Sequence, residues 1–190
     1  VCCHNSYQGE RHPAAATRNA FGDVYPFALC PSQPAVRAYL TALMRALSDY
    51  PLKTIQLESY GFGGFYHGHH HEKILANLDG LSAYLMGLCF CPACQQAAEE
   101  QGIDLQRVRN ATRAYLEAAF LGQTPTRGAT PAEVLEAVPE LAPYLALRDQ
   151  IIADWVHELA RASSKPLALL GAAPGTADCI AEVTDCAYRR

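Results

Sequence analysis

The residues with the clearest capacity for chemistry are three cysteines, Cys89, Cys91 and Cys94, which fall within the six residues CFCPAC. Thiols this close together do not readily form disulfides with one another, whereas thiolates are strong ligands for zinc. Tetrahedral zinc takes four such ligands at about 2.3 Å, so a fourth must come from another segment. The spacing therefore predicts a zinc site, against the alternative that the three are ordinary buried thiols.

Several other cysteines compete for the fourth ligand position. Cys30 is the best candidate, because it stands in a loop before a proline and away from any expected core element. Cys2 and Cys3 lie in a strand-like opening where one of them should face the core, and Cys179 and Cys186 lie near the other end. Four thiolates leave no open coordination position, so the predicted role is structural. Metal ligation also favours a reducing, cytoplasmic compartment over a disulfide framework.

The carboxylate with the best position for catalysis is Glu58, which follows the strand-like run KTIQL and precedes a glycine-rich loop. Parallel α/β enzymes place catalytic groups at such strand ends. Partial burial beside Tyr60 and Phe62 would raise the pKa of Glu58, as an acid catalyst requires. Glycosidic cleavage needs a second carboxylate, and the sequence does not identify one. The alternative for Glu58 is a structural ion pair at a strand end.

A histidine-rich segment, HGHHHE, follows Glu58 at residues 67–72. We expect its imidazoles to hydrogen-bond substrate hydroxyls around Glu58. Two alternatives remain open: a second, catalytic metal held by imidazoles, and the solvated polar start of a helix. Together with residues at the other predicted strand ends, the expected substrate contacts are His4, Asn5, Tyr60, His67, His69, His70 and His71.

The hydrophobic pattern predicts strands alternating with helices. Residues 5–34 carry Gly, Pro, Asn and Asp punctuation and are predicted to form a long loop. Strands are expected at 1–4, 53–58 and 166–171. Helices are expected from Pro34 onwards and over about 74–88, 95–101, 104–121 and 131–162, with a Gly102 cap and breaks at Pro139 and Pro143.

This alternation predicts an α/β protein with a parallel sheet. Both a doubly wound sheet and a (β/α)8 barrel satisfy it, and neither phosphate-binding glycine signature is present. The long loops follow strand carboxyl ends, which favours the barrel. We therefore expect residues 1–190 to form part of a (β/α)8 barrel, cut at both ends, with about three βα units and a long helical insertion.

Composition narrows the range of partners. The chain has 190 residues, half of them hydrophobic, and a formal net charge of −4. These values are typical of a globular domain and argue against a nucleic-acid or anionic-membrane partner. No apolar run approaches the roughly 20 residues of a membrane span. A homo-oligomer remains compatible with the sequence.

Three segments resemble, in the same order, the family 42 glycoside hydrolases, the zinc-containing β-galactosidases. They are CPSQPAVR from Cys30, QLESYG around Glu58, and CFCPACQ from Cys89, and the resemblance covers about residues 28–102. It implies a (β/α)8 barrel that hydrolyses a glycosidic bond in a carbohydrate, with Glu58 as the general acid/base. It also implies one zinc bound by Cys30, Cys89, Cys91 and Cys94.

Two other functions remain as alternatives. One is a metal-dependent hydrolase centred on the histidine segment, which predicts a second metal. The other is a barrel that binds carbohydrate without cleaving it.

Overall fold

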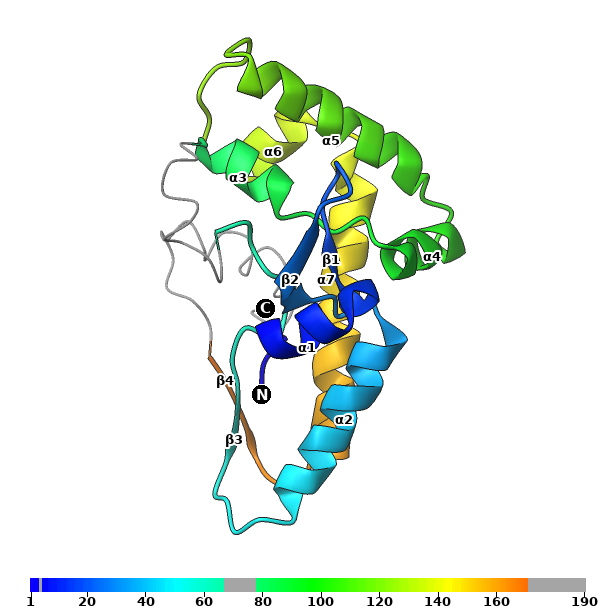
Figure 1. The fold of residues 1–190 in the computed structure, drawn as a ribbon, viewed down its shortest axis with the longest axis vertical. Helices are drawn as coiled ribbons and strands as arrows, with labels where there is room; N and C mark the ends of the chain where they lie inside the picture. Colours follow the sequence, from blue (N-terminus) through cyan, green and yellow to red (C-terminus); the bar gives the residue numbers. More distant parts are fainter. Residues whose placement is uncertain (4, 67–77, 171–190) are drawn as a thin grey trace.

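The computed structural model describes residues 1–3, 5–66 and 78–170 (Figure 1). Its helices are α1 (Ser6–Arg11), α2 (Pro34–Ser48), α3 (Gly80–Met86), α4 (Pro92–Glu100), α5 (Leu105–Phe120), α6 (Pro131–Ala137) and α7 (Leu141–Ala162), with a 3₁₀ turn η1 (Pro13–Ala15). Its strands are β1 (Ala16–Arg18), β2 (Val24–Leu29), β3 (Ile55–Leu57) and β4 (Leu167–Leu169). This mixture of helices and small sheets is compatible with the expected α/β class.

Parallel pairing joins two of the predicted strands, β3 and β4, with Leu57 opposite Leu169. The opening segment pairs with the other edge of β3. The Val1 amino group donates to the Gln56 carbonyl (2.8 Å), and the Glu58 amide donates to the Val1 carbonyl (3.0 Å). In a parallel pair of strands, one residue makes its two hydrogen bonds to the residues before and after the one that faces it, as Val1 does here. The three predicted strand segments therefore lie side by side in the order in which they occur in the sequence: the opening segment, then β3, then β4.

The prediction of a loop over residues 5–34 was wrong. This segment contains α1, η1 and an antiparallel hairpin of β1 and β2. Asn5 caps α1, its Oδ1 accepting from the Gln8 amide (3.1 Å). Gly9 lets α1 lie directly on β2, because a Cβ there would collide with the Pro26 carbonyl. The packing of α1 on β2 joins segments that are separated in the sequence, so local turn residues do not predict it.

The helix predictions hold with corrections. Helix α2 buries Val36, Leu40 and Met44 as its apolar spacing requires. Gly102 follows α4 with φ of +69°, the left-handed cap that glycine favours. Pro143 does not break the last helix: it lies in the first turn of α7, where an amide has no partner to lose. The residues predicted as strand after 170, and as helix over 74–77, lie outside the described part of the chain.

The long helix α7 runs along the long axis of the molecule and packs along α2 (Figure 1). Its inner face contributes Tyr144, Ile152, Trp155 and Leu159, all fully buried, to a core shared with β3. The same helix therefore supports both the parallel strands and the segment that carries the cysteine cluster. Within the described ranges, no helix combines the length and the apolar character that crossing a membrane requires.

Candidate metal centre

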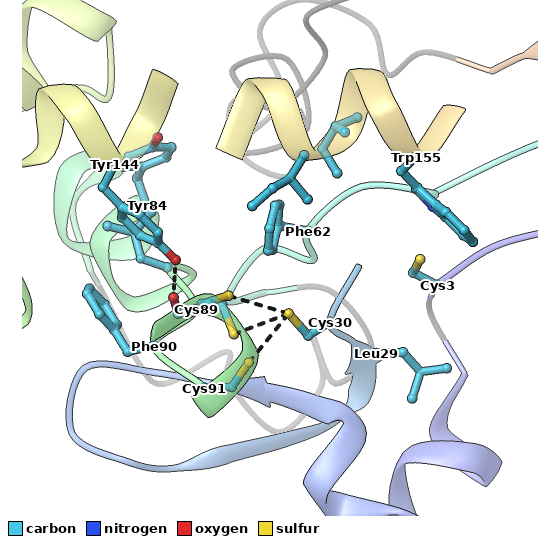
Figure 2. Close-up of a cluster of buried hydrophobic side chains, with 14 of the residues drawn as sticks. Cys3, Leu29, Cys30, Phe62, Tyr84, Cys89, Phe90, Cys91, Tyr144 and Trp155 are labelled. Atoms are coloured by element: carbon cyan, nitrogen blue, oxygen red, sulfur yellow. Dashed lines mark hydrogen bonds between the residues drawn. The ribbon is translucent and has the colours of Figure 1, made fainter. Parts of the chain in front are cut away.

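The four cysteines predicted as ligands come together in the fold. Cys30 lies beyond the end of β2, and Cys89, Cys91 and Cys94 lie between α3 and the first turn of α4. All four are buried, and their sulfurs lie within 4.8 Å of one another. Figure 2 shows the Cys30 thiol pointing at the cluster from the opposite side. We call these four residues the four-cysteine centre.

The sulfur separations match a tetrahedral metal site. The Cys30 Sγ lies 3.7 Å from that of Cys89, and 3.6 Å from those of Cys91 and Cys94. Four sulfurs at about 2.3 Å from a central ion, at tetrahedral angles, lie about 3.8 Å apart. A disulfide requires about 2.05 Å, so no pair here is bonded. The arrangement suits one metal ion with four thiolate ligands.

Local structure fixes each ligand. Cys91 is the N-cap of α4, Pro92 supplies the first helical residue, and Cys94 follows in the first turn. The chain before them is held to the hairpin, because the Phe90 amide donates to the Arg18 carbonyl (2.7 Å). Cys30 is held from the same side, its amide donating to the Ala15 carbonyl (2.9 Å). The hairpin missed by the sequence reading is therefore what brings Cys30 to the cluster.

Polar groups surround the sulfurs. The Arg18 amide donates to Cys89 Sγ (3.5 Å), the Gln33 side-chain amide donates to Cys91 Sγ (3.6 Å), and the Cys94 thiol donates to the Ser32 hydroxyl (3.4 Å). The two N–H donors directed at sulfur stabilise the thiolate, the form that binds metal. Tyr144 adds a hydrogen bond from its hydroxyl to the Cys89 carbonyl (Figure 2). Spacing alone could not single out these supporting groups, because they come from three separate segments.

Burial makes the centre dependent on a cation. It raises the pKa of Cys30 and Cys89 well above the ordinary thiol value, since a buried thiolate loses its hydration. The pKa of Cys91 is lowered instead, because side-chain hydrogen bonds with Cys30, Cys89 and Cys94 favour its thiolate form. Four thiolates together require a positive ion between them.

The competing cysteines do not join the centre. Cys3 is buried as predicted for one residue of the opening pair, and its thiol donates to the Tyr60 carbonyl (3.3 Å). Figure 2 places it beside Trp155, away from the cluster. Cys2 is half-buried and belongs to no metal-binding group among the described residues. Cys179 and Cys186 lie outside the described part of the chain.

Glu58 stands directly after β3, as predicted, but its side chain is exposed rather than partly buried. Its backbone is fixed on both sides. Its own amide donates to Val1, and the carbonyl of the next residue, Ser59, accepts from the Cys3 amide (3.0 Å). Ser59 has φ of +45°, which side chains rarely adopt, and the chain turns there. Glu58 is thus presented to solvent at the carboxyl end of a parallel strand.

The predicted substrate contacts divide into three groups. The Asn5 side-chain oxygen Oδ1 caps α1 by accepting a hydrogen bond from the Gln8 amide. The Tyr60 side chain is only 3% exposed and packs in the core under the loop after β3. Their contact with a substrate remains a prediction. The remaining five fall outside the described residues: His4, His67, His69, His70 and His71.

Compared with known proteins, the chain has no match among protein-family models, curated proteins or solved structures.

Proposed function

We propose that this chain belongs to a (β/α)8-barrel glycoside hydrolase in which the four-cysteine centre holds a structural zinc and Glu58 is the general acid/base. One observation carries the proposal: the four thiols singled out by the resemblance to family 42 glycoside hydrolases lie in tetrahedral proximity. That resemblance names Glu58 along with them. The metal geometry therefore supports the alignment of residues on which the catalytic assignment rests.

Zinc is the ion that fits the donor set best. Four thiolates at tetrahedral spacing suit zinc or a single iron, and a closed site with no free position suits a structural ion. When bound, the zinc would join the loop after β2 to the start of α4, and it would take no part in the reaction. Elemental analysis of the purified protein should return one zinc per chain and a colourless solution. A coloured iron protein would contradict this assignment.

The arrangement of strands supports Glu58 as the acid. The Val1–Cys3 segment, β3 and β4 run parallel as successive neighbours, as consecutive barrel strands do, and Glu58 follows the middle one. Its exposed carboxyl group is accessible to a bound glycoside. In the proposed reaction Glu58 gives its proton to the glycosidic oxygen as the carbon–oxygen bond breaks and the anomeric carbon bonds to a second carboxylate, which lies outside the residues identified here. Water then displaces that second carboxylate from the anomeric carbon, and the Glu58 carboxylate takes the proton that the water releases.

The test is the substitution Glu58→Gln in the full-length protein, assayed on aryl glycosides. The matched control is Glu100→Gln, because Glu100 is also an exposed glutamate and lies at the end of α4. Loss of a general acid costs about 10²- to 10⁴-fold in kcat/KM on substrates with poor leaving groups. A dinitrophenyl leaving group needs little protonation, so that substrate should lose much less. The zinc content should be unchanged in both variants.

Two results would count against the catalytic assignment. Equal activity of Glu58→Gln and Glu100→Gln on poor leaving groups would remove Glu58 from the mechanism. Glycoside binding by the native protein without turnover would support a carbohydrate-binding barrel instead.

A further inference from the structure

A cavity separate from the four sulfurs and from Glu58 lies between α1, η1 and the first turns of α2. Its volume is about 610 Å³. Small-molecule sites typically have volumes of about 300–1,000 Å³, so the cavity has room for a ligand of modest size. Leu29, from the end of β2, and Val36, from α2, form its floor, and both are almost fully buried.

The rim of the cavity carries a different chemistry from the floor. Arg11 and His12 supply basic groups, and Tyr39 supplies an aromatic ring that is 39% exposed. None of the described residues that line the cavity is acidic. A ligand bound here would meet apolar surface below and positive charge at the edge, without a carboxylate to neutralise that charge.

The two walls are held in place before any ligand binds. Gln33, which begins the α2 wall, donates from its side-chain amide to the Ala14 carbonyl in the opposite wall (2.9 Å). The Arg11 guanidinium lies 4.3 Å from the centre of the Tyr7 ring, one helical turn away on α1. Among the described residues, Arg11 has no ion-pair partner. Among the described side chains, its guanidinium is therefore stacked on an aromatic ring and not paired with a carboxylate.

We propose that this cavity binds a small organic anion, specifically a carboxylate carried on an aryl or alkyl body. The apolar body would cover Leu29 and Val36, and the carboxylate would pair with Arg11. Arginine suits this role because its planar guanidinium offers two parallel donors to a carboxylate. The site is distinct from that of the proposed glycosidase reaction, because none of its lining residues is one of the four cysteines or lies at the end of β3, although Gln33 also donates to Cys91 Sγ.

The probe for this proposal is 4-phenylbutyrate, titrated into the native full-length protein and followed by isothermal calorimetry. Its neutral amide and glucuronate serve as comparisons. The carboxylate should bind at least about threefold more tightly than the amide, because a half-exposed ion pair contributes modestly. Glucuronate, which has the charge without the apolar body, should bind more weakly still. Equal binding of the amide, or tighter binding of glucuronate, would overturn the proposal.

Two variants locate the binding. Arg11→Gln should abolish the preference for the carboxylate over the amide, whereas Arg113→Gln should not. Arg113 is a fair control, because it too is an exposed arginine stacked on an aromatic ring, that of Phe21. Ala35→Trp, at an exposed position in the first turn of α2, should fill the cavity and abolish binding with the fold retained by circular dichroism. Unchanged carboxylate preference in Arg11→Gln, or unchanged affinity in folded Ala35→Trp, would refute the site.

Discussion

The four-cysteine centre and the end of β3 both carry residues suited to chemistry, but they are held by different forces. At the centre, four buried side chains from two segments converge on one point, and only a cation between them allows all four to ionise. At the end of β3, one exposed carboxylate is positioned by backbone hydrogen bonds to the opening segment. Contacts within the protein are thus enough to identify a candidate metal site, whereas a candidate acid catalyst can be identified only from its position relative to a bound substrate.

The largest effect is expected when one of the proposed metal ligands is removed, because stability should depend on the four-cysteine centre far more than on the end of β3. Structural zinc contributes about 10–16 kcal/mol of binding free energy in small zinc domains, as much as the whole stability of about 5–15 kcal/mol of a typical domain. Cys91→Ser should therefore lose its metal and its cooperative thermal transition. Elemental analysis and circular dichroism measure both.

Cys2→Ser is the matched control for that substitution, because Cys2 lies outside the centre at the edge of β3. It should keep one metal per chain and a melting temperature near that of the native protein. A Cys91→Ser protein that retained both would show that the thiols are packed together without holding an ion.

The second prediction concerns Cys3, the buried thiol of the strand-end region. Burial and the neighbouring Cys2 raise its pKa from 9.0 to about 12, partly opposed by the Trp155 indole N–H. Three pKa units mean about 1,000-fold less thiolate at pH 8–9. Iodoacetamide should therefore leave Cys3 unmodified in the folded protein and alkylate it in guanidinium, as read by mass spectrometry.

The sign of the linked pH effect follows from the direction of that shift. A thiol whose pKa is raised on folding contributes its full stability below about pH 9. That contribution is lost as the pH rises from about 9 towards 12, where the unfolded chain ionises first. Half-buried Cys2 is the internal control in the same spectrum, and alkylation of Cys3 as fast as Cys2 would contradict its burial.

A third, smaller effect tests how far the metal centre depends on α7. Tyr144→Phe removes the hydroxyl that donates to the buried Cys89 carbonyl. An unsatisfied buried acceptor costs about 1–3 kcal/mol, so the melting temperature should fall and chelators should extract the metal faster. Tyr50→Phe is the control, because Tyr50 is 61% exposed. Equal melting temperatures and equal rates of metal extraction in the two variants would show that α7 does not support the metal centre.

The sequence predicted the features that depend on local pattern or on strong chemical identity. The apolar spacing from Val36 to Met44 predicted α2, and CFCPAC with Cys30 predicted the four cysteines that come together, because few residue types can hold a metal. It missed the β1–β2 hairpin, whose turn is organised by Asn19: its Oδ1 accepts three amides, from Phe21, Gly22 and Asp23.

The remaining misses have a different origin. Tyr144 reaches Cys89 across 55 positions of sequence, and nothing in its own neighbourhood marks it as a support of the metal centre. The exposure of Glu58 depends on the turn at Ser59 and on pairing with Val1, neither of which hydropathy reveals. Contacts between distant segments decide these features, and a single sequence records them only where the chemistry is as restricted as metal ligation.

The smallest expected effect returns to the end of β3, where Ser59 has φ of +45°. A side chain in this left-handed region costs roughly 1 kcal/mol, and glycine avoids that cost while losing more entropy on folding. Ser59→Gly should therefore change the free energy of unfolding by no more than about 0.5 kcal/mol. Ser59→Val, whose branched side chain suits this region least, should lose about 1–2 kcal/mol in denaturant titrations. If glycine costs as much as valine, the Ser59 side chain rather than the backbone turn holds this strand end, and Glu58 is positioned by side-chain contacts.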